Sequence, residues 1–295
     1  MDQFRNIGII GRIGSAKVVE TIRRLMKFFD DQAMNVILED RIAEVIPGHN
    51  RQVGRSQLLG EMCDLVIVVG GDGSLLGGAR KLAKYGVPVL GINRGKLGFL
   101  TDISPDEHME EKITEVLEGR YITESRFLLD AQVRRGGQPV ATLSSLNDVV
   151  LHPGKATTMI EFDLYIEGKF VYVQKSDGLI VSTPTGSTAY SLSGGGPIMH
   201  PKLDAIVLVP MFPHTLSSRP IVVDGNSEIK LIVSENNKTY PHISCDGQES
   251  FTLAPGDTIY IHKKPQKLKL IHPLDHDFYQ TCRDKLGWQT QRGLQ

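Results

Sequence analysis

The apolar run at residues 65–69, Leu-Val-Ile-Val-Val, constrains the fold of this chain more than any other segment. It is too short for a stable helix, and no polar side chain marks a face turned to solvent. A strand of this kind lies in the middle of a parallel sheet that helices cover on both sides. Other apolar runs at 7–10, 36–38 and 87–92 predict further strands of the same sheet.

Segments with helical spacing of apolar residues separate these strands. The first follows Ser15, a residue type that favours helix N-termini, and places Val18, Ile22, Leu25 and Phe29 on one face. Further helices are predicted at 75–84, 106–117 and 277–286. Strands that alternate with helices indicate right-handed βαβ units and a parallel sheet. The last of the helices is expected to pack back on this first domain.

Beyond about residue 121 the apolar pattern changes to a period of two, which is typical of strands with one buried face. Residues 159–168 show it most clearly, because Ile160, Phe162, Leu164 and Ile166 alternate with polar or half-polar residues. Similar strands are predicted at 127–133, 170–174, 229–233, 258–261 and 267–271. The sequence therefore predicts an α/β domain of residues 1–122, completed by 272–295, and a mainly antiparallel all-β domain of residues 123–271.

The charge balance excludes some classes of partner. The 295 residues contain 33 Lys and Arg against 34 Asp and Glu, so the basic excess of proteins that bind nucleic acid or anionic membranes is missing. The basic stretch at 262–269 is interpreted as a solvated strand face. No apolar run is long enough to span a membrane, and no signal peptide is recognisable. Cys63, Cys245 and Cys282 form no metal or disulfide pattern, so a cytoplasmic location is predicted.

A glycine loop, Gly70-Gly71-Asp72-Gly73, follows the central strand and opens a helix. Ligands bind at this edge of open α/β sheets, and the start of a helix favours an anion such as phosphate. The spacing fits neither the P-loop nor the G-x-G-x-x-G fingerprint. A carboxylate among phosphate-binding amides suggests that Asp72 binds a cation or accepts a proton from a hydroxyl nucleophile. The alternative is that Asp72 only caps the helix.

Small hydroxyl residues and glycines crowd the segment 176–197. Their donors suit a ribose–phosphate ligand, with Asp177 accepting from ribose hydroxyls and Tyr190 packing on a flat base. The same composition also suits a hydroxyl-rich turn between strands, and this alternative stays open. The segment has no G-x-S-x-G motif, so a serine hydrolase is not indicated. His272 and His276 are interpreted as part of a surface loop and not as metal ligands.

Several segments together resemble the NAD kinase family, which phosphorylates the 2′-hydroxyl of the adenosine ribose of NAD to make NADP. Gly70 to Gly73 match the family's Gly-Gly-Asp-Gly motif, and residues 183–197 match its Thr-Pro-Thr-Gly-Ser-Thr-Ala-Tyr-Ser-Leu-Ser-x-Gly-Gly-Pro segment. The pair Asn147-Asp148 stands where the family has Asn before Glu or Asp. Stretches at 93–102, 146–155, 208–214 and 286–288 extend the resemblance almost from end to end.

The resemblance implies a fold and an assembly. The N-terminal α/β domain would have a parallel sheet with flanking helices, as in phosphofructokinases and diacylglycerol kinases, and the C-terminal domain would be all-β. The active site would lie in the crevice between the two domains. Family members are usually homodimers or homotetramers, so a homo-oligomer is expected.

The resemblance also implies the reaction and its residues. ATP would give its γ-phosphoryl group to NAD, a divalent ion such as Mg²⁺ would be carried mainly by the ATP phosphates with no protein ligand assigned, and Asp72 would be the general base. The implied substrate contacts are Asp72, Gly73, Asn147, Asp148, Thr158, Lys175, Asp177, Thr188, Ala189, Tyr190, Ser191, Leu192, Ser193 and Gln248. Relatives often carry Arg or His where Thr158 stands. The alternatives are a lipid or sugar kinase of the same superfamily, and a non-catalytic NAD-binding sensor.

Overall fold

The computed structural model describes residues 4–95, 98–154, 158–215 and 217–288. The chain divides into two compact units, an N-terminal unit of residues 1–125 and 268–295 and a C-terminal unit of residues 126–267. These limits lie three and four residues from the predicted boundaries (125 against 122, and 267 against 271). Lys96, Leu97 and Lys155, which belong to segments of the family resemblance, lie outside the described residues.

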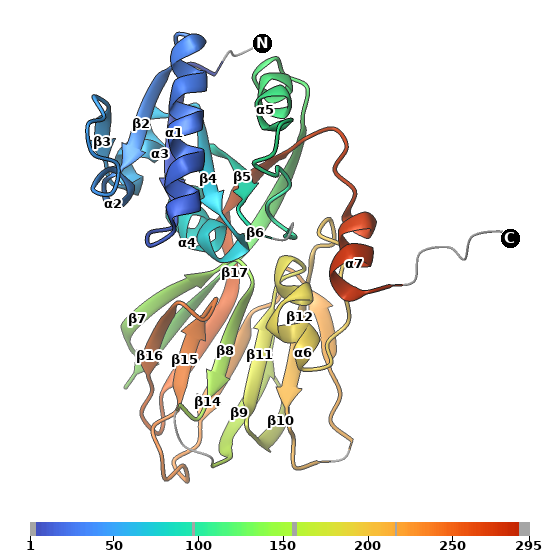
Figure 1. The fold of residues 1–295 in the computed structure, drawn as a ribbon. Coiled ribbons are helices and arrows are strands. Elements are labelled where there is room, and N and C mark those ends of the chain that lie inside the picture. Colours follow the sequence, from blue (N-terminus) through green and yellow to red (C-terminus); the bar gives the residue numbers. More distant parts are fainter. Residues whose placement is uncertain (1–3, 96–97, 155–157, 216, 289–295) are drawn as a thin grey trace, which may run out of the picture. The chain divides into compact units, whose positions relative to one another are not determined.

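The N-terminal unit is built on a parallel sheet with the strand order β17, β5, β4, β1, β2, β3 (Figure 1). Its own strands are β1 (Asn6–Gly11), β2 (Asn35–Glu39), β3 (Gln52–Gly54), β4 (Leu65–Gly70) and β5 (Pro88–Asn93). Its helices are α1 (Ala16–Asp31), α2 (Asp40–Ala43), α3 (Ser56–Met62), α4 (Asp72–Leu82), α5 (Met109–Leu117) and α7 (Phe278–Leu286), with a 3-10 turn η1 (Ala83–Tyr85). Every residue of β4 is buried, as the apolar run predicts.

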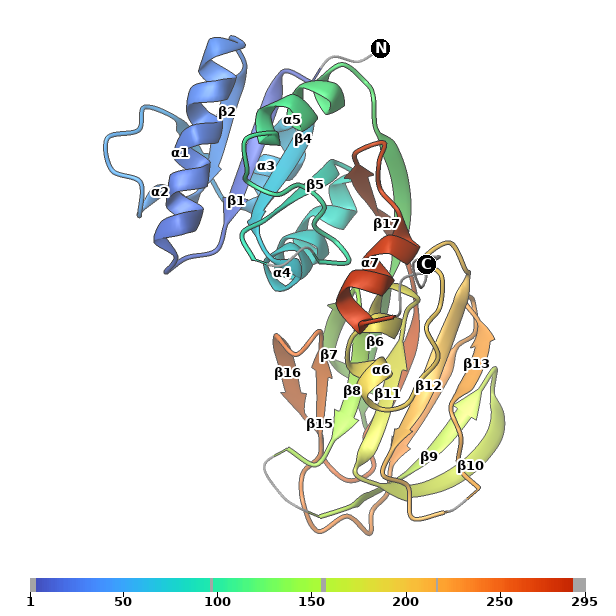
Figure 2. The same ribbon diagram turned by 45° about the vertical axis from the view of Figure 1, so that its right-hand side comes forward.

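Helices cover both faces of this sheet. Side chains of α1 and α5, among them Ile22 and Ile113, share one core cluster with Ile7, Ile67 and Leu90 of the strands. Helices α3 and α4 pack against each other, and α4 also packs on β4 and β5 (Figure 2). Because both faces are covered, the carboxyl ends of the strands are the part of the sheet left to meet a ligand.

The structure differs from the sequence prediction in several elements of the N-terminal unit. Helix α4 begins at Asp72 and not near 75, because Ser74 and Leu75 already donate backbone hydrogen bonds to Gly71. Ser15 occupies the N-cap position of α1, but its side chain makes no capping hydrogen bond. The short elements α2, β3 and α3 were not expected, since segments of three to seven residues show too little periodicity to be recognised.

The C-terminal unit contains two packed antiparallel sheets. One has the order β13, β12, β11, β8, β15, β16, and the other contains β10, β9 and β14 with β6, β7 and β17. The strands are β7 (Gln138–Ser145), β8 (Asp148–His152), β9 (Ile160–Ile166), β10 (Lys169–Ser176), β11 (Gly178–Ser182), β12 (Ala205–Met211), β13 (Ile221–Asp224), β14 (Ile229–Val233), β15 (His242–Cys245) and β16 (Glu249–Thr252), with η2 (Thr185–Thr188) and α6 (Tyr190–Ser193). Among the described residues, no helix is both long and apolar enough to cross a membrane.

Two long strands, β6 (Ile122–Arg135) and β17 (Thr258–His272), each contribute residues to both units. The sequence predicts two separate strands at 258–261 and 267–271, whereas the structure has the single strand β17. The first part of β17 pairs with β14 and the last part with β5. The two apolar ends of β17 therefore pack in different cores. The polar residues between them break the apolar pattern, so the sequence does not indicate a single strand.

Apolar residues from both sheets form the core of the C-terminal unit. Ile160, Phe162 and Leu164 of β9 point inward on alternate positions, as the period of two predicts. Strands β8, β11 and β12 are also apolar on their outer face, where Val150 and Ile180 join a second cluster. The glycine- and hydroxyl-rich segment 176–197 contains β11, and Met199, just beyond it, packs in that second cluster.

Candidate functional site

The Asp72 side chain lies at the start of α4 and binds a neighbouring loop. Its Oδ2 accepts the backbone N–H of Phe99 at 2.8 Å. Its Oδ1 accepts the N–H of Leu100 at 3.2 Å and the hydroxyl of Thr101 at 3.0 Å. A Cβ at Gly98 would lie 1.8 Å from Oδ1, so glycine is needed for this close approach. The carboxylate is thus held in one position by the loop 98–101.

These contacts argue against the capping interpretation of Asp72. Gly71 is the N-cap residue of α4 and has no side chain that could cap the helix. The carboxylate of Asp72 binds the loop instead. Each carboxylate oxygen has about two acceptor sites. Oδ1 has two donors and Oδ2 has one among the described residues, so Oδ2 keeps a site for a further hydroxyl.

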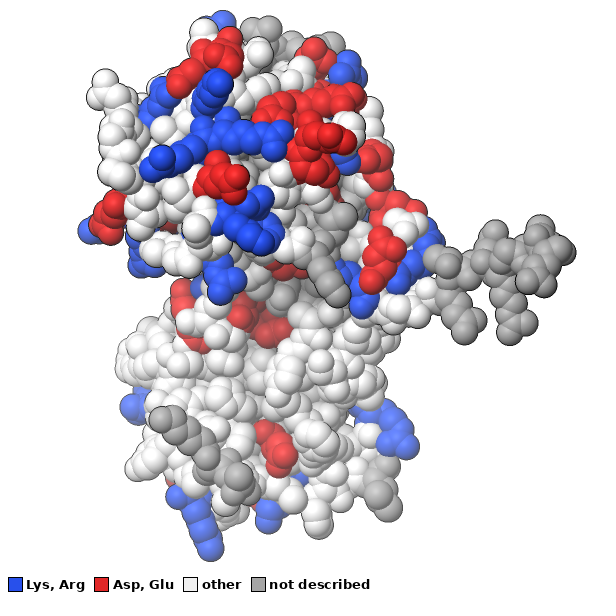
Figure 3. Space-filling view, in the orientation of Figure 1, with Lys and Arg blue, Asp and Glu red and all other residues white. Residues whose placement is uncertain are grey.

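A groove of about 310 Å³ surrounds Asp72 in the N-terminal unit. Its lining consists of Arg12, Ser15, Val18, Gly70, Gly71, Asp72, Asn93, Arg94, Gly95, Gly98 and Lys285. Three of these side chains are cationic, and Asp72 is the only carboxylate among the described lining residues. On the face drawn in Figure 3, charged side chains of both signs lie over the N-terminal unit, whereas the C-terminal unit shows mostly uncharged side chains. A glycine loop, a helix start and cations together suit phosphate groups.

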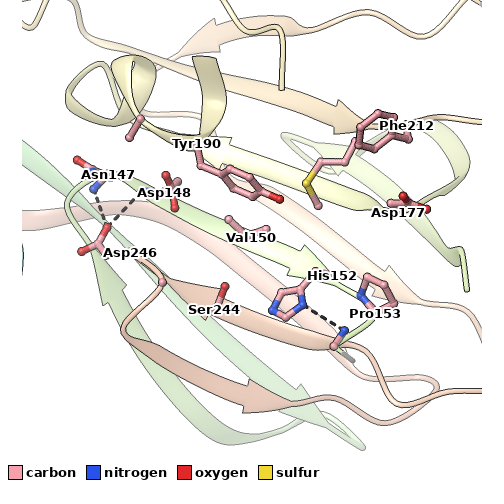
Figure 4. A pocket seen from close by; sticks show the side chains of 14 residues that line it. Asn147, Asp148, Val150, His152, Pro153, Asp177, Tyr190, Phe212, Ser244 and Asp246 are labelled. Atoms are coloured by element: carbon pink, nitrogen blue, oxygen red, sulfur yellow. Dashed lines mark hydrogen bonds between the residues drawn. The ribbon is translucent and has the colours of Figure 1, made fainter. Parts of the chain in front are cut away.

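The C-terminal unit has a larger pocket of about 640 Å³ (Figure 4). It is lined by Asn147, Asp148, Val150, His152, Pro153, Gly154, Asp177, Ala189, Tyr190, Met211, Phe212, Ser244, Asp246 and Gly247. The Tyr190 side chain reaches over the strand that carries Val150, with Asp148 beside it. No lysine or arginine is among the described residues of this lining. Three carboxylates and an aromatic ring suit the hydroxyls and the base of a nucleoside better than a pyrophosphate.

Asp246, which sequence reasoning missed, holds the turn before β8 in place. Its carboxylate accepts the backbone N–H groups of Leu146 at 3.0 Å, Asn147 at 2.8 Å and Asp148 at 3.3 Å. Its own backbone has a φ of +53°, a conformation that aspartate tolerates better than most residues. The motif Cys245-Asp-Gly-Gln248 contained the signal, because Asp-Gly marks a tight turn, but only the fold shows what that turn binds.

Asp148 is buried in the pocket beside Asp246. Burial raises the pKa of Asp148 to about 7, and the negative charge of Asp246 adds to the rise. The carboxyl therefore carries a proton for part of the time at neutral pH and changes its charge within the physiological range. A group of this kind in a pocket is a candidate for ligand contact.

We expect Asp148→Asn to stabilise the protein in a pH-dependent way. Because the folded protein holds a proton that the unfolded chain releases, stability falls as pH rises from the ordinary aspartate pKa of 3.8 towards 7. At about pH 8 the variant should exceed the wild type by on the order of 2 kcal/mol in the free energy of unfolding, and below pH ~4 the difference should vanish. Urea denaturation at both pH values measures it.

Asp177→Asn is the matched control, since Asp177 lines the same pocket but is exposed. It should leave the pH dependence of stability unchanged. An Asp148→Asn protein with the wild-type difference between the two pH values would show that Asp148 does not titrate in this range.

The hydroxyls of the segment 182–187 do not form a ligand surface. Ser182 and Thr183 donate to the backbone oxygens of Asn147 and Leu146. Ser187 donates to Pro184 and accepts the N–H of Met199. These three side chains are fully buried, so the turn interpretation describes them. Their role is to fix the turn that presents Asn147 to the pocket.

Some of the other residues predicted to contact substrate line a cavity, and others do not. Ala189 and Tyr190 line the pocket together with Asn147, Asp148 and Asp177. Ser193 lines an adjoining cavity of about 380 Å³, which also touches Tyr190. Neither cavity is lined by Thr158, Lys175, Thr188, Ser191, Leu192 or Gln248. Gly73 is exposed in the first turn of α4, and a Cβ there would meet no atom within 4 Å. For all these residues, ligand contact stays a prediction.

The surface-loop interpretation of residues 272–277 is wrong for His272. This side chain is fully buried, and it lies with His276 against Asp102. The interpretation failed because the partner carboxylate is 170 residues away in the sequence.

Family models match both units of the chain. The ATP-NAD kinase N-terminal domain matches residues 7–121, and the ATP-NAD kinase C-terminal domain matches residues 146–273. The NAD kinase of Hahella chejuensis (strain KCTC 2396) is 69% identical over 292 residues, which cover 99% of this chain and 98% of that protein.

Two solved structures share the fold. Yeast NADH kinase complexed with NADH is 27% identical with a TM-score of 0.89, and the match covers 100% of this chain and 91% of that one. An NAD kinase from Archaeoglobus fulgidus in complex with ATP is 25% identical with a TM-score of 0.74, over 96% of this chain and 97% of that one. With both domains matched and high identity along nearly its whole length, the chain belongs to the NAD kinase family.

Proposed function

We propose that this protein is an NAD kinase, which transfers the γ-phosphoryl group of ATP to the 2′-hydroxyl of the adenosine ribose of NAD. The observation that carries the proposal is the Asp72 carboxylate, fixed at the start of α4 in a groove lined by Arg12, Arg94 and Lys285. Such a groove would bind phosphates through its cationic side chains and glycine amides. The Asp72 carboxylate would be the base that accepts the proton of the ribose hydroxyl.

The charges of the two cavities suggest how the substrates divide between them. The phosphates that react would lie in the groove of the N-terminal unit, where the cations are. A nucleoside would bind in the pocket of the C-terminal unit, where Asn147, Asp148 and Asp177 offer hydrogen bonds to ribose hydroxyls or a base and Tyr190 offers a ring for stacking. The predicted crevice between the two domains stays a prediction.

Asp72 would act as the general base of the reaction. The 2′-hydroxyl would donate a hydrogen bond to Oδ2, which keeps an acceptor site. As the 2′-oxygen bonds to the γ-phosphorus, the bond from that phosphorus to the bridging oxygen breaks and ADP leaves. The hydroxyl proton passes to Asp72. The loop contacts of the carboxylate keep it oriented, so that little reorganisation is needed.

A divalent ion fits this groove if it is bound mainly by the phosphates of ATP. Mg²⁺ commonly binds through substrate phosphates with few protein carboxylates. The described groove residues include only one carboxylate, Asp72, whose oxygens already hold the loop. The ion, when bound, would neutralise charge on the phosphates. We therefore propose that Mg²⁺ rests mainly on the triphosphate, with no dedicated protein ligand.

A coupled assay tests the proposed function. The purified protein is incubated with NAD and Mg-ATP, and an NADP-specific dehydrogenase detects the product. We expect steady formation of NADP that depends on both substrates and is abolished by chelation of Mg²⁺. Absence of NADP would overturn the proposal. In that case, binding of NAD without turnover would indicate a sensor, and phosphorylation of a lipid or sugar would indicate another kinase.

We also propose a homo-oligomer, a dimer or a tetramer, in the cytoplasm. The family resemblance supports the assembly, and Cys63, Cys245 and Cys282, all buried thiols, fit a reducing compartment. Light scattering coupled to size exclusion would measure the mass of the assembly. A mass equal to one chain would contradict the proposal.

A further inference from the structure

The loop 98–102 has two anchors that face different partners. On one side, Phe99, Leu100 and Thr101 donate to Asp72, and Thr101 is fully buried. On the other side, the next residue, Asp102, binds His272, the last residue of β17, and His276 in the segment that follows. The position of the Asp72 donors therefore depends on how Asp102 is held.

Two histidines hold the Asp102 carboxylate. His276 Nδ1 lies 2.9 Å from Oδ1, and His272 Nδ1 makes a short hydrogen bond with Oδ2. The two imidazole rings stack with their centroids 4.0 Å apart. Burial alone would raise the pKa of Asp102, but the hydrogen bonds from the two histidines lower it well below its usual range. The carboxylate is thus ionised and bridges both rings.

The surroundings of His272 favour a positively charged ring. Its second nitrogen, Nε2, lies 3.5 Å from Glu124 Oε2 on β6, so each nitrogen faces a carboxylate. A neutral imidazole would turn a lone pair towards one of the two carboxylates. Burial lowers the pKa of His272, but the hydrogen bond with Asp102 and the negative charges of Asp102 and Glu124 outweigh burial and raise it. The groups that act on this ring are Asp102, Glu124 and the stacked His276.

The separations within the cluster are those of hydrogen bonds and not of metal ligands. Two ligands of a tetrahedral zinc ion, each about 2.0–2.1 Å from the metal, would lie about 3.3 Å apart. His276 Nδ1 and Asp102 Oδ1 are closer than this, at 2.9 Å, and the His272 contact is shorter still. Each ring Nδ1 is therefore placed to donate a hydrogen bond to the Asp102 carboxylate.

The same segment also reaches the Asp72 groove. The Phe278 ring, at the start of α7, lies 6.2 Å from the ring of Phe99 in the loop. Lys285, near the end of α7, lines the groove itself. The residues from His272 to Lys285 thus contact the loop at two places and complete the groove at a third.

We propose that Asp102, His272 and His276 form a positioning cluster, in which the positive charge of His272 keeps the loop 98–102 in the form that binds Asp72. This inference rests on the proposed function, since it concerns the orientation of the proposed base. None of the three residues needs to touch substrate. Loss of the His272 charge removes its electrostatic attraction to Asp102 and Glu124 and loosens the loop, so Asp72 loses its alignment. A misplacement of about 1 Å can cost roughly 100-fold in rate.

The test compares His272→Asn with the wild type. Asparagine can still donate a hydrogen bond to Asp102 but can never be charged. We expect kcat to fall by about 10–100-fold, with KM for NAD within about twofold, because alignment and not binding is lost. Because His272 has a raised pKa, the charged form dominates below that pKa and is lost as pH rises through it. The wild-type kcat should therefore decline at alkaline pH, and the variant should lack this decline.

Amide hydrogen exchange provides a readout that does not depend on activity. In His272→Asn the amides of Phe99 and Leu100 should exchange about tenfold faster, because their bonds to Asp72 open more often. His276→Asn, which alters a less buried member, should show the same direction with a smaller effect. Lys112→Met is the matched control, because the ion pair of Lys112 with Asp275, at 2.9 Å, ties the same segment to α5 without touching the loop.

The outcomes separate the inference from the proposed function. If the wild type forms no NADP, the proposed function fails, and the exchange data still report on the cluster. If the wild type is active but folded His272→Asn keeps its kcat, its alkaline decline and its amide protection, the positioning role is overturned. An equal effect of Lys112→Met would also overturn it, since any loosening of the segment would then suffice.

Discussion

Asparagine in place of Asp72 is expected to lower kcat for NADP formation by about 10²–10⁴-fold. The affinity for NAD should change by less than about threefold, because the amide is nearly the same size and the base acts mainly in the transition state. An asparagine oxygen can still accept from Leu100 and Thr101, but its amide group cannot take the proton of the ribose hydroxyl. Steady-state kinetics with the coupled assay, together with NAD binding by calorimetry, measure both quantities.

The Asp72→Asn variant also weakens the loop, so the experiment needs a control for that effect. The asparagine amide group would face the N–H of Phe99, which removes one of three hydrogen bonds. Thr101→Val also removes one of the three while leaving the carboxylate intact. We expect this control to lose about tenfold or less in kcat. If Asp72→Asn loses no more than Thr101→Val, the carboxylate is an anchor for the loop and not the base.

Glycine in place of Asp246 is expected to weaken NAD binding by about tenfold or more and to lower the free energy of unfolding by about 1–3 kcal/mol. The substitution removes the acceptor of three backbone N–H groups, those of residues 146–148. Glycine accepts the φ of +53° at this position, so the loss reflects the side chain and not backbone strain. Calorimetric titration with NAD and urea denaturation test the two parts of the prediction.

Glu167→Gly is a closely matched control for that experiment. Glu167 also has a positive φ, of +50°, and its carboxylate accepts the backbone N–H of Glu228 at 2.6 Å. It lies in the turn between β9 and β10, and it is not among the residues that line the nucleoside pocket. The control should keep wild-type affinity for NAD. If Asp246→Gly also keeps it, the pocket of the C-terminal unit is not where NAD binds.

Much of the fold could be predicted because local patterns of apolar residues indicate strands and helices. The fully apolar run of β4 indicated a strand covered on both faces, and the alternation in β9 indicated a strand with one buried face. The structure confirms both. The single strand β17 could not be predicted, because its two ends pair with strands of different units and its middle has no alternation. Pairing partners depend on the whole chain, which a local pattern does not contain.

The candidate site shows the same division between local and distant information. The glycine loop identified Asp72, and the resemblance identified Asn147 and Asp148. The sequence could not show that the Ser182 and Thr183 hydroxyls donate to backbone carbonyl oxygens, because composition does not say where a hydroxyl points. It also missed Asp246, whose partners begin 100 residues earlier.

By itself, the sequence determined the alternation of strands and helices in the first part of the chain, the change to strands beyond it, the carboxylate in the glycine loop and membership of the NAD kinase family. These features depend on residue type and on spacing along the chain, which are both properties of the sequence. Only the tertiary structure decided which polar groups remain available for a ligand and which are used up inside the protein. It placed His272 between Asp102 and Glu124, and it buried Asp148 beside Asp246. Charge state and hydrogen-bond occupancy follow from burial and from neighbours that are distant in the sequence, so they emerge only when the chain has packed.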